Sequence, residues 1–218
     1  MIGIVTDSTC DIPQPLLDQH GIIVVPQVLI WGDREYHDRI DMQPAEFYER
    51  LAADRQPPRS SQPTRLDFSS AFANAVEHGA SSIVALVLSS TLSGSIDNAK
   101  MAAAECVVPV EVIDSRATSM GLGWQVLAAA RAVENGLDLR GVLERVNLVR
   151  GRIVQLAALD TLEYVRKGGR VAEGTQETAG TEIYSGHTDN SFSRQWRAFS
   201  TSLLPPLPGA SARRTRER

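Results

Sequence analysis

Seven residues, SSTLSGS at positions 89–95, carry groups suited to binding an anion. They follow an apolar run typical of a buried strand and precede an alanine-rich stretch typical of a helix. At the first turn of a helix, unpaired backbone N–H groups and the macrodipole both favour negative charge. Ser93 and Ser95 add hydroxyls, and Gly94 removes the side chain that would block a ligand's close approach to the backbone. The segment is therefore predicted to be an anion-binding turn between a strand and a helix.

A simpler interpretation is that Ser93 or Ser95 only caps the helix, because serine is common at that position. Two observations favour binding. The turn holds four serines and a threonine in seven residues, which is more than one cap requires. A second serine-rich loop, SSQPT at 60–64, stands at another helix start and offers a further set of donors.

No recognisable motif pairs these serines with a general base. The chain has neither a GxSxG elbow nor a GxxxxGK[ST] phosphate loop, which weakens the hydrolase and NTPase hypotheses. His20, His37 and His78 are scattered near the ends of predicted elements. Asp7 and Asp114 are expected to brace the turns after their strands rather than to bind a metal. We therefore expect no catalytic residue and no metal ligand, which favours recognition over bond-breaking.

Composition places the chain among ordinary globular proteins. It has 218 residues, of which 43% are hydrophobic and 22% charged, and a formal net charge of -4. This mild acidic excess gives no electrostatic reason to expect nucleic acid as a partner. No apolar run approaches the ~18 residues of a membrane span, and no signal peptide is recognisable. Two cysteines, Cys10 and Cys106, fit a reducing compartment, so the expected location is the cytoplasm.

Periodicity and turn residues predict an α/β fold with three layers, α/β/α, around a mostly parallel sheet. A loop is expected at 56–64, since its three prolines cannot share a central strand. Glycines 121 and 123 are expected to permit close packing of their helix. The predicted strands are 2–5, 22–30, 34–37, 82–88, 110–113 and 154–159. The predicted helices are 16–20, 44–54, 64–78, one from the serine turn to 104, 119–134, 138–150 and 160–167.

Polar turns follow several of these strands. They lie at 7–9, 89–95 and 114–115, and another polar turn, at 168–170, follows a helix. Ligands of open α/β sheets bind outside the carboxyl ends of the strands. These turns are therefore expected to form one site for a carboxylate or phosphate, built from neutral donors and one cation, Arg170.

Five motifs, in order, resemble those of the DegV family: IVTDSTCDIP at 4–13, SSQPT at 60–64, LSSTLSGS at 88–95, VIDS at 112–115 and RKGGRV at 166–171. The resemblance covers residues 1–171. It implies a two-domain α/β protein, itself not an enzyme, that holds one long-chain fatty acid such as palmitate and needs no other cofactor. It also implies a partner, the catalytic subunit of a fatty acid kinase that serves phospholipid synthesis. The implied fatty-acid-binding residues are Ser60, Ser61, Ser93, Gly94, Ser95 and Arg170.

The resemblance ends after Arg170. We expect an N-terminal α/β domain at 1–160, the start of an incomplete second α/β domain at 161–171, and a poorly ordered tail at 172–218, rich in Ser, Thr, Gly, Pro and Arg. The departure suggests a truncated or frame-shifted chain with one wall of the acyl tunnel missing. Two alternatives to fatty-acid binding follow: a family remnant that binds no lipid, and an enzyme acting on a small carboxylated or phosphorylated metabolite.

Overall fold

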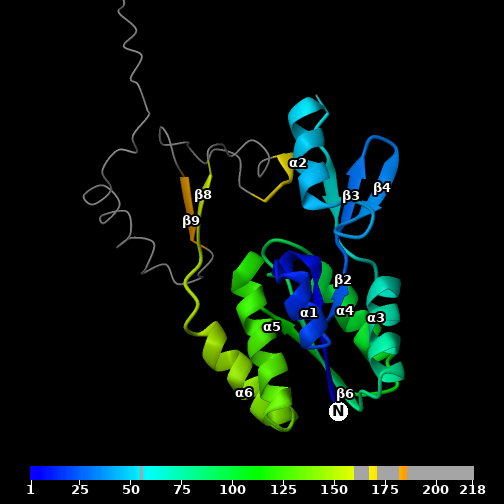
Figure 1. Cartoon of the computed structure of the whole chain (residues 1–218), viewed down its shortest axis with the longest axis vertical. Coiled ribbons are helices and arrows are strands. Elements are labelled where there is room, and N and C mark those ends of the chain that lie inside the picture. Colours follow the sequence, from blue (N-terminus) through cyan, green and yellow to red (C-terminus); the bar gives the residue numbers. More distant parts are fainter. Residues whose placement is uncertain (55, 160–166, 171–181, 186–218) are drawn as a thin grey trace, which may run out of the picture. The chain divides into compact units, whose positions relative to one another are not determined.

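The computed structural model of the chain describes residues 1–54, 56–159, 167–170 and 182–185. Its central sheet has four parallel strands in the order β2-β1-β6-β7. Figure 1 shows the chain, with β2 and β6 of this sheet labelled. These strands are β1 (Ile2–Asp7), β2 (Ile23–Val25), β6 (Ser82–Val87) and β7 (Val110–Asp114). The predicted α/β class with a parallel sheet is confirmed, and β6 pairs with β7 in parallel.

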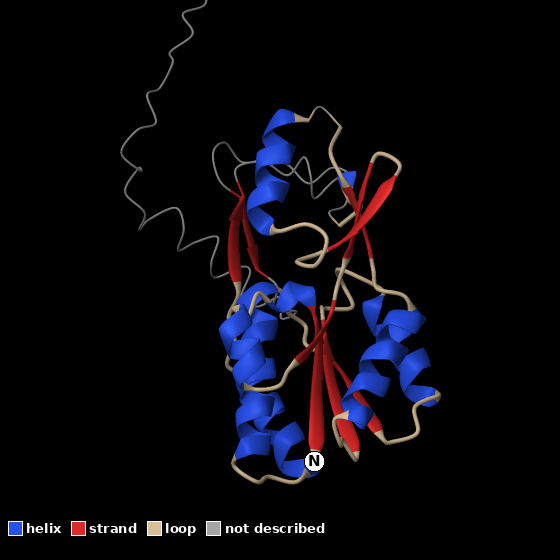
Figure 2. Cartoon of the chain, turned by 45° about the vertical axis from the view of Figure 1, so that its right-hand side comes forward, coloured by secondary structure: helices blue, strands red, loops and turns tan. Residues whose placement is uncertain are grey.

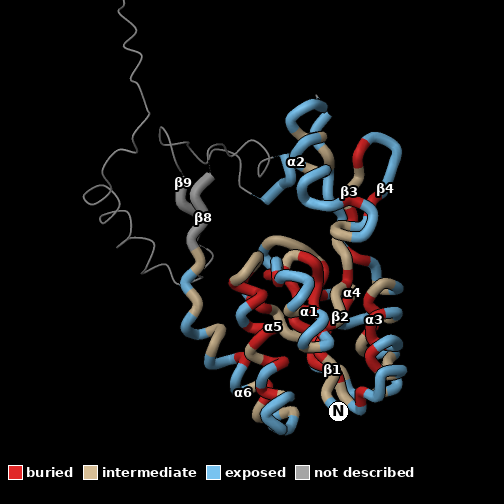
Figure 3. The backbone as a smooth tube through the Cα atoms, in the orientation of Figure 1, coloured by how far each residue is buried: buried red, intermediate tan, exposed pale blue. Residues whose placement is uncertain are grey.

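Helices cover both faces of this sheet (Figure 2). Val84 and Leu86 of β6 pack on one face with α1 (Gln14–Gln19), α5 (Ser119–Glu134) and α6 (Leu139–Arg150). Ile83 and Ala85 point to the other face, which α3 (Arg65–Glu77) and α4 (Ser95–Ala104) cover. Because β6 is apolar on both faces, it runs through the centre of the core, where buried residues gather (Figure 3).

Several helix boundaries follow from capping residues. Thr64 and Asp67 form a capping box at the start of α3. Asp138 caps α6 by accepting a hydrogen bond from the Gly141 N–H at 2.9 Å. Gly21, just after α1, has a φ of 58°, the left-handed conformation in which glycine is favoured.

The elements between β2 and α3 form a small lobe that is not part of the central sheet. It consists of α2 (Pro44–Ala53) and an antiparallel sheet of β4 (Arg34–His37), β3 (Val28–Trp31) and β5 (Arg59–Ser61), in that order. Trp31 and Phe47 pack edge to face with ring centroids 5.6 Å apart, and the Arg50 guanidinium lies 4.3 Å from the Trp31 ring. Figure 1 shows α2, β3 and β4 together.

Two sequence predictions are wrong in this region. The apolar run 22–30 is not one strand, because β2 and β3 belong to different sheets. Pro26 lies between them and has no N–H with which to continue a ladder. The segment 56–64 is not all loop, since β5 fits between its prolines, pairing Ser60 with Leu29 and Ser61 with Val28.

The far part of the chain is described only in pieces. β8 (Leu156–Leu159) pairs antiparallel with β9 (Glu182–Ser185), so four residues of the predicted tail are in a strand. The helix predicted at 160–167 lies outside the described residues except for Lys167. The rest of the expected tail, 172–181 and 186–218, lies outside them as well.

Gly123 shows why α5 carries glycine. A Cβ atom there would lie 2.5 Å from the Cys10 carbonyl oxygen, in the 3₁₀ turn η1 (Ser8–Cys10) that follows β1. No real side chain tolerates that separation from a backbone atom, so the expected close packing of this helix is confirmed.

We predict that Gly123→Ala lowers the free energy of unfolding by about 1–3 kcal/mol, because helix and turn must separate to admit the methyl group. Urea denaturation measures the change. Gly151→Ala at the end of α6 is the matched control, since its methyl group would make only ordinary contacts, the shortest 3.5 Å to the Asn147 carbonyl oxygen. Its expected effect is neutral or stabilising by up to about 1 kcal/mol. Equal losses in the two variants would contradict the packing argument.

Candidate functional site

The carboxylate of Asp7 lies at the carboxyl end of β1 and is fully buried. It accepts hydrogen bonds from the Leu88 N–H at 2.7 Å, the Thr9 N–H at 3.0 Å and the Thr9 hydroxyl at 2.5 Å. Leu88 follows β6, so one side chain ties the ends of two adjacent strands. Asp7 therefore braces the turns, as the sequence indicated.

Burial raises the pKa of Asp7, because an ionised carboxylate loses its hydration in the core. The hydrogen bonds from Thr9 and Leu88 oppose this shift without cancelling it. The carboxyl is therefore protonated more readily in the folded chain than in the unfolded one.

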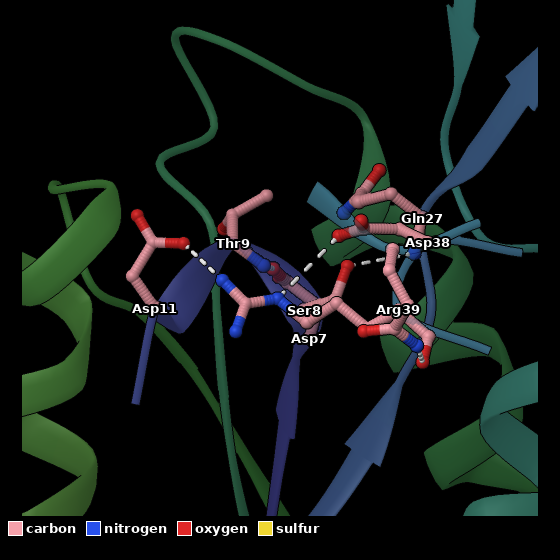
Figure 4. A network of polar contacts seen from close by, with 8 residues as sticks. Asp7, Ser8, Thr9, Asp11, Gln27, Asp38 and Arg39 are labelled. Atoms are coloured by element: carbon pink, nitrogen blue, oxygen red, sulfur yellow. Dashed lines mark hydrogen bonds and ion pairs between the residues drawn. The ribbon is translucent and has the colours of Figure 1, made fainter. Parts of the chain in front are cut away.

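Polar contacts around Asp7 also attach the small lobe to the sheet (Figure 4). Ser8 Oγ accepts a hydrogen bond from the Gln27 N–H at 3.0 Å, where the chain enters the lobe. Arg39, which follows β4, donates to Asp11 Oδ1 at 2.6 Å. These contacts fix the lobe at the carboxyl edge of the sheet, where the predicted site lies.

The 89–95 turn begins where β6 ends and leads into α4. The Leu92 and Ser93 N–H groups both donate to the Ser89 carbonyl, at 2.9 and 3.2 Å. Gly94 is the N-cap of α4 and has no side chain with which to cap it. Ser93 Oγ accepts from the N–H of Ser95, the first residue of the helix, at 3.2 Å, and the Ser93 and Ser95 hydroxyls lie 2.9 Å apart.

The two hydroxyls differ in access. Ser95 is fully buried, whereas Ser93 is half-buried. Within the described chain, the N–H groups of Gly94 and Ile96 donate to no acceptor. Of the Ser93 and Ser95 pair, only the Ser93 hydroxyl is accessible, and it lies at a helix start where two backbone amides have no acceptor within the described chain, which are donors that suit an anion.

The strand end of β7 supports this turn from the other side. Asp114 accepts hydrogen bonds from the Ser90 hydroxyl at 2.6 Å, the Ser90 N–H at 3.2 Å and the Arg116 N–H at 2.9 Å. Asp114 thus acts as a brace, as predicted. No group of three metal-ligating side chains occurs in the described part of the chain.

Arg170 joins the two serine-rich loops. Its guanidinium donates to the Leu92 carbonyl at 3.3 Å and to Ser60 Oγ at 3.3 Å. The cation expected from the sequence is therefore adjacent to both the 89–95 turn and the 60–64 loop. Three segments that are far apart in the sequence meet at this point.

Ser60 and Ser61 lie on opposite faces of the lobe sheet, because side chains alternate along a strand. Ser60 contacts Arg170, whereas the Ser61 hydroxyl contacts only the Gln62 carbonyl, at 3.5 Å, among the described residues. The structure therefore brings Ser60 toward the turn and does not bring Ser61 there.

Sequence reasoning missed two residues of this cluster. Gln62 lies beside Gly94, and Asn98 of α4 donates to the Pro63 carbonyl at 2.8 Å. Gln62 stands two residues after Ser60, a spacing that places two side chains on one side of an extended segment. This spacing is the sequence signal that could have identified Gln62.

The histidines in the described part of the chain form no contact with this cluster. His20 Nδ1 lies 2.6 Å from Glu134, His37 Nδ1 lies 2.7 Å from Asp41, and His78 contacts the Asn74 carbonyl. In the described residues, no histidine forms a hydrogen bond with a serine of the 89–95 turn.

A cavity of about 660 Å³ lies at the opposite, amino-terminal edge of the sheet. Its lining includes Ile2, Leu17, Ile22 and Val133, and none of the predicted site residues. It is therefore a separate feature from the serine cluster.

Comparison with known proteins agrees with this architecture. The family described as "Uncharacterised protein, DegV family" matches residues 1–180. The chain belongs to the DegV family. A DegV domain-containing protein of Streptomyces coelicolor is 37% identical over 173 residues, and one of Deinococcus radiodurans is 33% identical over 170. Each alignment covers 78% of this chain and 60% of the relative, so the chain spans about 60% of the length of these DegV relatives.

Solved DegV structures share the fold. One is described as showing fatty acid binding of a DegV family protein from Thermus thermophilus. It is 30% identical, with a TM-score of 0.77 over 92% of this chain and 77% of that one. A Thermotoga maritima protein, whose structure is described as revealing a fatty acid binding function, is 29% identical with a TM-score of 0.72, over 78% of this chain and 63% of that one. In the described part of this DegV chain, no helix is long and apolar enough to cross a membrane.

We predict that Asp7→Asn lowers the free energy of unfolding by about 1–3 kcal/mol, because an amide cannot accept all three hydrogen bonds. The pH dependence should change as well. A raised carboxyl pKa contributes stability that is fully present below about pH 4 and is lost as the pH rises through the folded pKa. Denaturation across this pH range should show that slope in the wild type and a reduced slope in the variant. Asp33→Asn, in the exposed hairpin turn, is the control, and an unchanged slope in Asp7→Asn would contradict the assignment.

We predict that Cys106 alone reacts with a thiol reagent in the folded protein at about pH 8. Cys10 is buried, and burial raises its pKa to about 11, whereas Cys106 is half-buried. Absorbance at the end of the reaction with Ellman's reagent should indicate one thiol, and two after denaturation. Cys106→Ser should then show none until it unfolds. Rapid reaction of Cys10 would contradict the packing of η1.

Proposed function

We propose that this chain binds a long-chain fatty acid and holds its carboxylate at the 89–95 turn. The observation that carries the proposal is that Ser60, Arg170 and the beginning of α4 lie together. Arg170 donates hydrogen bonds to Ser60 Oγ and to the Leu92 carbonyl. Similar proteins described as fatty-acid-binding, at 29–30% identity, support the same ligand class.

The chemistry of the cluster suits a carboxylate. A carboxylate accepts several hydrogen bonds, and burying its charge is costly unless donors are supplied. Ser93, the Gly94 N–H and the Ile96 N–H supply neutral donors, and Arg170 supplies a cation. Ser95 is proposed to act through its hydrogen bond with Ser93, because its own hydroxyl is buried.

Ser61 is included in the proposed site on the DegV resemblance alone, because its side chain lies on the face of β5 opposite to Ser60. An acyl chain attached to the carboxylate would add about 0.8 kcal/mol for each CH₂ buried against apolar side chains. That term favours long chains over short ones.

The proposed function is to bind the fatty acid and not to transform it. The histidines in the described residues have partners elsewhere, so none of them is positioned as a base against Ser93. Presentation of the carboxylate to a fatty acid kinase is a further part of the proposal, and it rests on the DegV resemblance. The exposure of Arg170 beside the turn suits a surface that a second protein approaches.

We predict that protein purified from a bacterial host carries a bound fatty acid such as palmitate, detected by native mass spectrometry. Ser93→Ala should retain less of it, with a Kd raised about 5- to 150-fold by loss of a donor worth about 1–3 kcal/mol. Ser70→Ala, on the exposed side of α3, is the matched control and should bind as the wild type does. A folded wild-type protein without lipid, and without affinity for added palmitate, would refute the function. Normal retention by Ser93→Ala would remove Ser93 from the site.

A further inference from the structure

The side-chain amide of Gln62 lies against Gly94, at the beginning of α4. A Cβ atom on Gly94 would be 2.7 Å from Gln62 Oε1 and 3.2 Å from Gln62 Nε2. The amide therefore occupies the space that the absent side chain of Gly94 leaves open. It lies beside the same backbone that the proposed function assigns to the carboxylate.

The backbone on either side of Gln62 is held in place. Before it, Ser60 and Ser61 pair with β3. After it, the Pro63 carbonyl accepts a hydrogen bond from Asn98 Nδ2 at 2.8 Å, and Thr64 caps α3. The position of Gln62 over Gly94 is therefore imposed by both flanking segments and not by the side chain itself.

The Gln62 amide makes no hydrogen bond within the described chain. Next to it, the Gly94 and Ile96 N–H groups are also without an acceptor there. A primary amide offers two N–H donors, whereas a carboxylate offers only acceptors. The Gln62 amide, which has no partner within the described chain, therefore lies beside a helix start whose Gly94 N–H also has no acceptor there.

We propose that Gln62 donates an amide N–H to the carboxylate of the bound fatty acid, and so selects the free acid over lipids with uncharged head groups. This inference rests on the proposed function and adds a specificity-determining residue to it. A hydrogen bond to an ionised acceptor is stronger than one to a neutral acceptor, so Gln62 contributes most when the head group is charged.

The test compares two ligands with the same acyl chain, palmitate and hexadecanol, by displacement of a fluorescent fatty acid near neutral pH. In Gln62→Ala the Kd for palmitate should rise about tenfold, while the Kd for hexadecanol stays unchanged. Gln62→Glu should weaken palmitate binding further, because two carboxylates repel each other, and should leave hexadecanol binding unchanged. Gln19→Ala and Gln19→Glu, at the exposed end of α1, control for loss of an amide and for added charge.

The possible results distinguish the proposed role of Gln62 from the proposed fatty-acid binding on which it rests. Wild-type affinity for palmitate in Gln62→Ala overturns the role of Gln62 and leaves fatty-acid binding standing. Equal losses for palmitate and hexadecanol also overturn it, since they indicate a general effect on the loop. A wild-type protein that binds neither ligand overturns the proposed function, and the role of Gln62 with it.

Discussion

The arrangement of the turns at the carboxyl edge of this sheet depends on the hydrogen bonds that the buried Asp7 carboxylate accepts. It accepts from the Leu88 N–H on one oxygen and from Thr9 on the other, so it joins the end of β1 to the end of β6. Burying an ionisable carboxyl costs free energy, and the raised pKa of Asp7 reflects that cost. The hydrogen bonds offset part of it, and they determine where the 89–95 turn begins.

Most of the hydrogen-bond donors at the carboxyl edge of the sheet are uncharged groups. Gly94 leaves room at the helix start, which the Gln62 amide occupies, and Ser93 places a half-buried hydroxyl next to it. Arg170 adds positive charge from a segment more than seventy residues away in sequence, where it bridges Leu92 and Ser60. We propose that such a site holds an anion through hydrogen-bond donors and one positive charge, since hydrogen bonds to an ionised acceptor are strong.

Local sequence patterns predicted the central fold well. The capping pair Thr64 and Asp67, and glycine after α1, act through neighbouring backbone groups, so they can be read directly from the chain. The small lobe was harder to predict. The β-branched run on either side of Pro26 has strand propensity throughout, and only the missing N–H of proline separates it into two sheets. β5 has no apolar pattern, and it forms because the edge of β3 is available to it.

The sequence by itself determined the family, the parallel sheet and the turns that hold candidate donors, because strand period, caps and glycine conformations are local properties. Only the tertiary structure decided which donors meet. It placed Ser60 near Arg170 and turned Ser61 to the other face, and it brought Gln62 against Gly94. These arrangements depend on the register of β5 with β3 and on the Asn98 contact with Pro63, and contacts between distant segments have no local signature.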